Sequence, residues 1–149
     1  MYPIVLAIHN IVRWVVLVVG VIAVVWALIG WFGKRQWSST DRTLGMVYTS
    51  AIDIQLLLGL ILYVFLSPIT KSMFQNLSQM MSNAGMRFFG LEHAFYMIVA
   101  VVLAHVGSAL SKKASEPVAK HRAAAIWFGL ALILILLGMP WSRPLLPGF

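Results

Sequence analysis

The stretch FFGLEHAFYMIVAVVLAHVGSAL, residues 88–110, decides the fold of this chain. A transmembrane helix needs about 20 predominantly apolar residues, and this run is long enough to be one. It nevertheless contains Glu92, His93 and His105, whose side chains are costly in hydrocarbon. Ionisable groups inside such a segment usually mark a functional site. We therefore expect the other helices to pack around this one.

The composition of the whole chain is that of an integral membrane protein. Of its 149 residues, 61% are hydrophobic and only 10% are charged, whereas soluble domains carry about 25% charged residues. The length fits a single domain over residues 1–149. The chain has no cysteine, which excludes disulfides, thiolate metal sites and covalently attached haem.

The net charge of +7 could indicate a nucleic-acid partner. The basic residues, however, flank the apolar segments. This placement favours membrane topology and contact with anionic lipid instead. We therefore expect the lipid bilayer, and no nucleic acid, as the partner of this charge.

Apolar runs predict an all-α bundle of four transmembrane helices. The runs cover residues 4–32, 44–66, 88–110 and 123–139. Residues 67–87 alternate apolar and polar side chains at helical spacing, which predicts a short amphipathic helix in the membrane interface. That helix is either a packed cap over the bundle or a lid over a site for a lipid-soluble substrate.

Two short basic loops set the expected topology. Residues 33–43 and 111–122 carry seven of the eleven Lys and Arg residues: Lys34, Arg35, Arg42, Lys112, Lys113, Lys120 and Arg122. The positive-inside rule places such loops in the cytoplasm. Both termini are then expected outside, and His121, within the second loop, is expected to be solvated.

Two histidines are expected at the same depth in the membrane. His9 lies five residues inside the first predicted helix, and His93 lies five residues inside the third. Each is roughly 7 Å below the outer end of its helix. Imidazole is the usual ligand of b-type haem iron and also suits zinc and copper. Two histidines are too few for a structural zinc site, but they complete a haem iron whose other four ligands come from the porphyrin.

The surroundings of His9 and His93 leave two interpretations open. Mostly small residues continue the face of each histidine along its helix, which permits close helix packing and also leaves room for a flat cofactor. Each histidine alone is equally well explained as a hydrogen-bonded interior residue. If haem is bound, Arg87 and Arg143 are the candidates for holding its propionates, because arginine makes charge-assisted contacts to carboxylates.

Arg13 and Asp53 are expected to form a buried ion pair. Each lies about 13 Å deep in a hydrocarbon core of about 30 Å, on the first and second helices. Neither charge is tolerable alone at that depth, so pairing is the simplest solution. The functional alternative is a proton path through Asp53.

Glu92 and His105 are the remaining ionisable groups of the third helix. Glu92 either pairs with Arg87 near the interface or carries protons. His105 is rotated by about 120° from His93 and cannot share its face. Glu92 and His105 together are therefore candidates for a proton path.

Four motifs taken together resemble those of small bacterial four-helix membrane proteins described as cytochrome b-like. They are HNIVRW at 9–14, DIQLLLGLILY at 53–63, RFFGLEH at 87–93 and PWSRP at 140–144. The resemblance covers most of the chain and implies haem b in a bundle of the bacterial inner membrane, with electron exchange with quinone. It carries across at His9, Arg13, Gln55, Glu92 and His93. Related chains can carry His where this one has Asp53, so the resemblance does not imply a haem ligand on the second predicted helix.

The sequence thus predicts a membrane electron-transfer protein with one haem b, working with quinone as a subunit of a larger redox complex. Other membrane subunits or further copies of the chain are the expected partners. Two other functions remain open. One is a cofactor-free structural or assembly subunit, and the other is a small proton- or ion-conducting protein.

The topology can be tested with reporter fusions. Because the basic residues gather in two loops, a reporter fused to the C-terminus should report the outer compartment, and one inserted in residues 111–122 should report the cytoplasm. The reverse pattern would remove the argument that His9 and His93 lie near the outer face.

Overall fold

The computed structural model describes residues 1–143, and its elements over this range are all helical. Four segments in it are long and apolar enough to cross a membrane. They are α1 (Tyr2–Phe32), Ser39–Leu66, Ala84–Lys113 and α7 (Pro117–Gly138). The predicted all-α class and the four apolar spans are therefore confirmed.

The second and third spans each contain a π-helical turn. In the second, α2 (Ser39–Ile61) continues as η1 (Leu62–Leu66); in the third, η2 (Phe88–Glu92) precedes α6 (His93–Lys113). The Tyr63 hydroxyl of η1 donates a hydrogen bond of 2.6 Å to the carbonyl oxygen of Gly90 in η2. This hydrogen bond links the two turns, and such turns are frequent at functional sites.

Two of the helices begin earlier than their apolar runs predict. Helix α2 starts at Ser39 rather than 44, because the Asp41 carboxylate accepts hydrogen bonds from the backbone N–H and the hydroxyl of Ser38, both at 2.7 Å. Helix α7 starts at Pro117 rather than 123, and proline suits the first turn of a helix. The loops on this side are correspondingly shorter than expected.

The connection between the second and third spans consists of three short helices, not one. They are α3 (Pro68–Gln75), α4 (Leu77–Ser82) and α5 (Ala84–Arg87). Asn76 and Asn83 separate them, and each side-chain oxygen accepts a hydrogen bond from the backbone N–H three residues later. Asparagine favours such N-caps over helix interiors, so it divides the amphipathic run.

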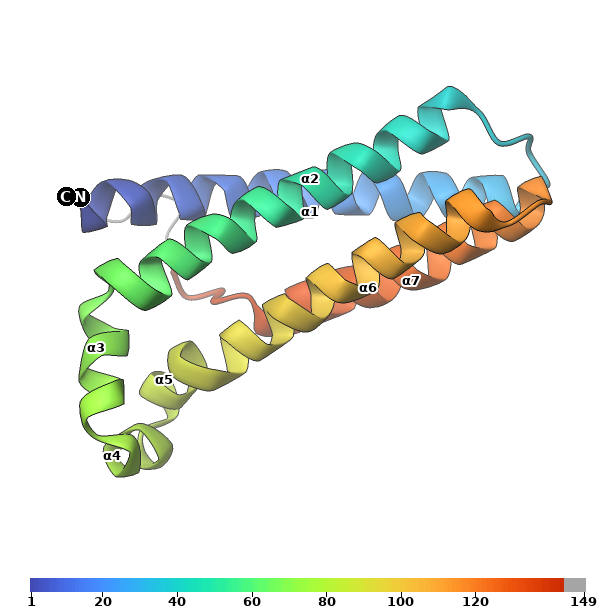
Figure 1. Cartoon of the computed structure of the whole chain (residues 1–149). Coiled ribbons are helices and arrows are strands. Elements are labelled where there is room, and N and C mark those ends of the chain that lie inside the picture. Colours follow the sequence, from blue (N-terminus) through green and yellow to red (C-terminus); the bar gives the residue numbers. More distant parts are fainter. Residues whose placement is uncertain (144–149) are drawn as a thin grey trace.

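The four long helices form two pairs that diverge along their length (Figure 1). Helices α1 and α2 pack together, as do α6 and α7, while α1 also packs on α7. In this view α2 crosses α1, and α1 lies closest to α6 and α7 beside the short loops and separates from them toward the open end, where α3, α4 and α5 connect the second and third spans. The core of the closed part is built from alanines around the T-shaped pair of Tyr48 and Phe128.

Close contact between α6 and α7 depends on a helical glycine. A Cβ added to Gly107 would lie 2.7 Å from Trp127 Cβ and 3.1 Å from Phe128 Cδ1. Gly129 on α7 has room instead, since the nearest atom to its added Cβ is Val24 Cγ1 at 4.0 Å. Small residues at helix interfaces are a common device of membrane bundles.

We predict that Gly107→Ala lowers the free energy of unfolding by about 1–3 kcal/mol, because the added methyl group overpacks the α6–α7 contact. The matched variant Gly129→Ala should leave stability unchanged or raise it slightly, since alanine is the better helix former. Thermal unfolding in detergent measures both. Equal melting temperatures for the two variants would contradict the observed packing.

Candidate functional site

A cavity of about 290 Å³ lies between the helices where the two pairs diverge. Side chains from α1, α2, α3 and α6, both π-helical turns, and α7 with the residues after it, line the cavity. His9 and His93 are both among them, and their ring centroids are 6.4 Å apart with ring planes at 76°. The structure therefore brings together the two histidines that the sequence predicted at one depth.

His93 is held by a backbone carbonyl at the end of α7. Its Nδ1 lies 2.6 Å from the carbonyl oxygen of Gly138, so this nitrogen carries the proton and donates. The other ring nitrogen, Nε2, is then the unprotonated one and can accept a hydrogen bond or bind a metal. Histidine ligands of metal ions are typically oriented in this way through their second nitrogen.

His9 is positioned by Gln55 of α2. The Gln55 amide nitrogen donates to the His9 carbonyl oxygen at 3.0 Å and lies 3.3 Å from His9 Nε2. His9 Nδ1 is buried and has no hydrogen-bond partner among residues 1–143. The ring packs close to Gly59, where a Cβ would lie 3.3 Å from His9 Cε1. Because an amide nitrogen can only donate, His9 Nε2 is the unprotonated, accepting nitrogen, and the protonated Nδ1 is left without an acceptor in the described part of the chain.

Two guanidinium groups also belong to the cavity wall. Arg143 lines it as a predicted candidate, with its guanidinium 4.7 Å from the centre of the Phe89 ring. Arg13 lines it too, and donates to the carbonyl oxygens of Pro140 and Arg143 at 3.3 and 3.0 Å. Arg13 therefore joins the site, a role that its depth along α1 did not indicate.

Arg87 does not line the cavity. Its Nε donates to Glu92 Oε1 at 2.8 Å, and its Nη1 donates to the carbonyl oxygen of Met81 at 3.3 Å. The structure therefore favours the predicted pairing of Glu92 with Arg87 over a ligand-binding role for Arg87.

The structure does not bring Arg13 and Asp53 together, so the predicted ion pair is wrong. Asp53 Oδ1 lies 2.8 Å from His105 Nε2 instead, and both side chains are about half exposed. Equal depth was not sufficient, because the helix faces differ. Two residues along a helix turn the side chain by about 200°, so Gln55, which reaches His9 on α1, leaves Asp53 pointing away from α1.

Glu92 and His105 belong to separate contacts. They are about 20 Å apart along the third span, with Glu92 paired to Arg87 and His105 paired to Asp53. His105 lies outside the cavity lining. The structure therefore provides no direct contact between the two residues predicted for a proton path.

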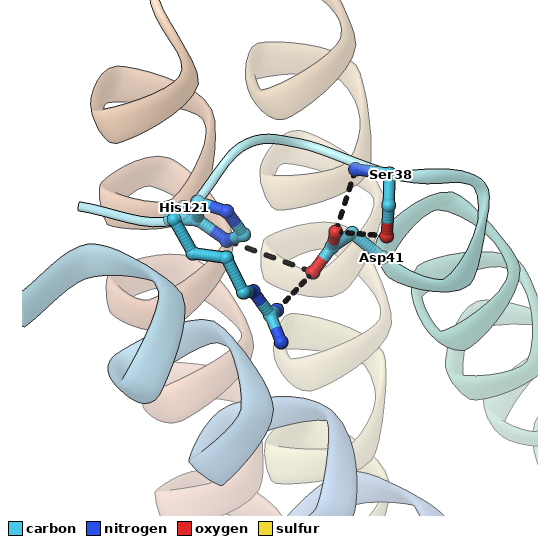
Figure 2. A network of polar contacts seen from close by, with 4 residues as sticks. Ser38, Asp41 and His121 are labelled. Carbon is cyan, nitrogen blue, oxygen red and sulfur yellow. Dashed lines mark hydrogen bonds and ion pairs between the residues drawn. The ribbon is translucent and has the colours of Figure 1, made fainter. Parts of the chain in front are cut away.

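A second polar cluster closes the other end of the bundle (Figure 2). Asp41 accepts from the Arg35 guanidinium at 2.7 Å, and its Oδ1 also lies 3.7 Å from His121 Nδ1. His121 is fully buried, its ring 4.9 Å from that of Trp37. Its prediction as a solvated loop residue is wrong, because α7 begins before it and turns it inward. The S-x-x-D pattern of Ser38 and Asp41 was the sequence signal for this cluster.

Comparison of the chain with protein-family models finds no match. Comparisons with curated proteins and with solved structures find none either. The fold and the cavity define the class: a four-helix membrane protein with two histidines facing one cavity.

We predict that Asp41→Ala lowers the free energy of unfolding by about 1–3 kcal/mol, because it removes the helix cap and the buried carboxylate that accepts from Ser38 and Arg35. Glu116→Ala is the matched control, since Glu116 precedes α7, is exposed and makes no capping bond. It should change stability by less than about 0.5 kcal/mol. Thermal unfolding in detergent distinguishes the two, and equal effects would remove any special role for the cluster.

Proposed function

We propose that the protein is a membrane electron-transfer protein that binds one haem b between His9 and His93. The observation that carries this proposal is the separation of the two imidazoles across the cavity, 6.4 Å between ring centroids. A metal ion about 2 Å from one nitrogen of each ring would separate the ring centres by about 6 Å. Haem between the helices of a bundle is a common arrangement.

The donor atoms support this ligand. His93 has a protonated nitrogen fixed by Gly138, which leaves Nε2 for a metal. His9 Nε2 is likewise the unprotonated nitrogen of its ring, because the Gln55 amide nitrogen 3.3 Å away can only donate. The residues described there contain no cluster of three His, Cys, Asp or Glu side chains suited to a metal ion. Two histidines therefore suit a haem iron, whose porphyrin supplies four ligands, better than a metal ion held by protein alone.

The volume of the cavity adds a requirement. At about 290 Å³ it lies just below the range of small-molecule pockets, about 300–1,000 Å³. A porphyrin needs more space, so haem binding requires the open ends of α2 and α6 to separate further. These two helices pack less extensively on each other than α1 on α2 or α6 on α7, so they are the ones that can separate at the lowest cost.

The other residues of the cavity have roles that follow from their chemistry. Arg143 and Arg13 provide cationic groups for the propionates. Apolar side chains, including Met97, Val101 and Met139, exclude water from the ligands. Bound haem would supply one-electron chemistry at this site, and the chain's own residues hold and orient it.

The membrane setting extends the proposal. We place the protein in the bacterial inner membrane with both termini outside, which puts α3, α4 and α5 in the outer interface over the open end of the bundle. Ile69 and Thr70 of α3 line the cavity there. A quinone arriving from the lipid would meet the haem edge at this end, and further subunits would supply or remove electrons.

We predict a Soret band and a low-spin haem spectrum for the protein purified after haem-replete expression. His9→Ala and His93→Ala should each abolish the low-spin spectrum, because each removes one of the two histidines that would hold the haem, and added imidazole should restore it by entering the space left behind. His105→Ala is the control, since this histidine lies outside the cavity.

A spectrum that survives both cavity variants, or one that depends on His105, would refute the ligand assignment. Absence of a Soret band from correctly folded wild-type protein would favour the two alternatives, a cofactor-free assembly subunit or a proton- or ion-conducting protein. Separation of Glu92 from His105 weighs against conduction through those two residues.

A further inference from the structure

The outer face of α2 and α6 carries an ion pair that the cavity does not use. Asp53 Oδ1 and His105 Nε2 are 2.8 Å apart, and the side chains are 48% and 52% exposed. Both residues lie near the middle of their helices, at the depth of the hydrocarbon core. The pair therefore faces lipid in an isolated copy of the chain.

Such a position is unfavourable for a lone molecule. Ionisable side chains within membrane spans are costly and almost always face protein or a water-filled space. The Asp53 and His105 side chains share one hydrogen bond and make no other among residues 1–143, so each has further polar atoms without a partner. Lipid tails offer none, so a protein surface is needed to cover the pair.

The residues around the pair form a surface suited to helix packing. One row of exposed residues on each helix, the row that contains Asp53 on α2 and His105 on α6, recurs at alternating spacings of three and four. Its other members are Met46, Ser50, Leu57 and Leu60 on α2, and Ile98, Val102 and Ala109 on α6. This 3.5-residue period is typical of helices that pack at a small angle. Apolar members of the stripe would also tolerate lipid, but Asp53 and His105 would not.

We propose that a second copy of the chain covers this face, forming a two-fold dimer around Asp53 and His105. Two copies inserted in the same direction are related by an axis along the membrane normal, which keeps every residue at its own depth. Because Asp53 and His105 are hydrogen-bonded to one another, they share one depth. The axis therefore brings Asp53 of each copy to the level of His105 of the other, the reciprocal contact that a two-fold interface requires.

The chemistry of the pair is self-complementary. A protonated imidazole donates through both ring nitrogens, and a carboxylate accepts through both oxygens. Each His105 can then donate through Nε2 to Asp53 of its own chain and through Nδ1 to Asp53 of the other copy. The four side chains form a closed, electrically neutral ring in which no charge remains unpaired. A different subunit would need its own polar group at this depth to do the same.

Cysteine cross-linking tests the proposal, because the chain has no native cysteine. Ser50→Cys and Val102→Cys place a thiol on the proposed face, one on each helix, without altering Asp53 or His105. Ile133→Cys is the matched control, exposed on α7, which lies on the other side of the bundle from α2. With a short bis-maleimide in native membranes, at least one of the first two variants should give a species of twice the chain mass, and the control should not.

A double variant tests the polar contact itself. Asp53→Leu with His105→Leu removes both charges together, so neither is left stranded and the monomer should fold. We expect the dimer to dissociate about tenfold more readily, the effect of losing two interhelical hydrogen bonds of the strength found in membranes. Native mass spectrometry from nanodiscs measures the monomer-to-dimer ratio.

Three results would overturn the proposal. They are no cross-link from either face variant, an adduct whose mass shows a different partner protein, and a double variant that dimerises like the wild type. The haem spectrum is unaffected by any of these results, because Asp53 and His105 lie outside the cavity. Failure of the dimer and failure of the haem proposal are therefore distinguishable.

Discussion

A polar side chain inside a membrane span must find a partner in the bundle or on a neighbouring protein, because lipid offers no hydrogen bonds. The arrangement of this molecule follows from that constraint. Arg13 binds the carbonyl oxygens of Pro140 and Arg143 where the chain leaves α7, and His93 binds the one at Gly138. Gln55 joins α2 to α1 through His9. These contacts draw the four helices around one cavity.

The two ends of the bundle solve the same problem differently. At the closed end, Asp41 gathers Ser38, Arg35 and His121, while small residues let α6 and α7 pack closely. At the open end, three short helices connect the second and third spans, and the Tyr63 hydroxyl links the two π-helical turns. The closed end thus holds the helices in register, and the cavity that both His9 and His93 line lies toward the open end.

Depth along a helix and direction around it contributed differently to the predictions. His9 and His93 meet because both their depth and their faces agree. Arg13 and Asp53 agree in depth alone, and the turn between Asp53 and Gln55 sends Asp53 to the outside. The prediction for His121 was wrong because the apolar run begins at 123, which does not reveal that the first turns of α7 start at Pro117 and include this histidine. Arg87 forms an ion pair with the nearby carboxylate of Glu92 and does not line the cavity.

The sequence by itself determined the helical class, the four spans and the depth at which His9 and His93 lie, because all three follow from hydropathy and the fixed rise of a helix. It did not determine which faces meet, since that depends on how the helices rotate and pack against one another. Only the tertiary structure decided that Arg13 belongs to the cavity, that Asp53 binds His105, and that His121 is buried. The division of the connecting segment at Asn76 and Asn83 likewise became visible only in the folded chain. In the pattern of apolar and polar residues, an asparagine that caps a helix looks the same as one on the polar face of a continuous helix.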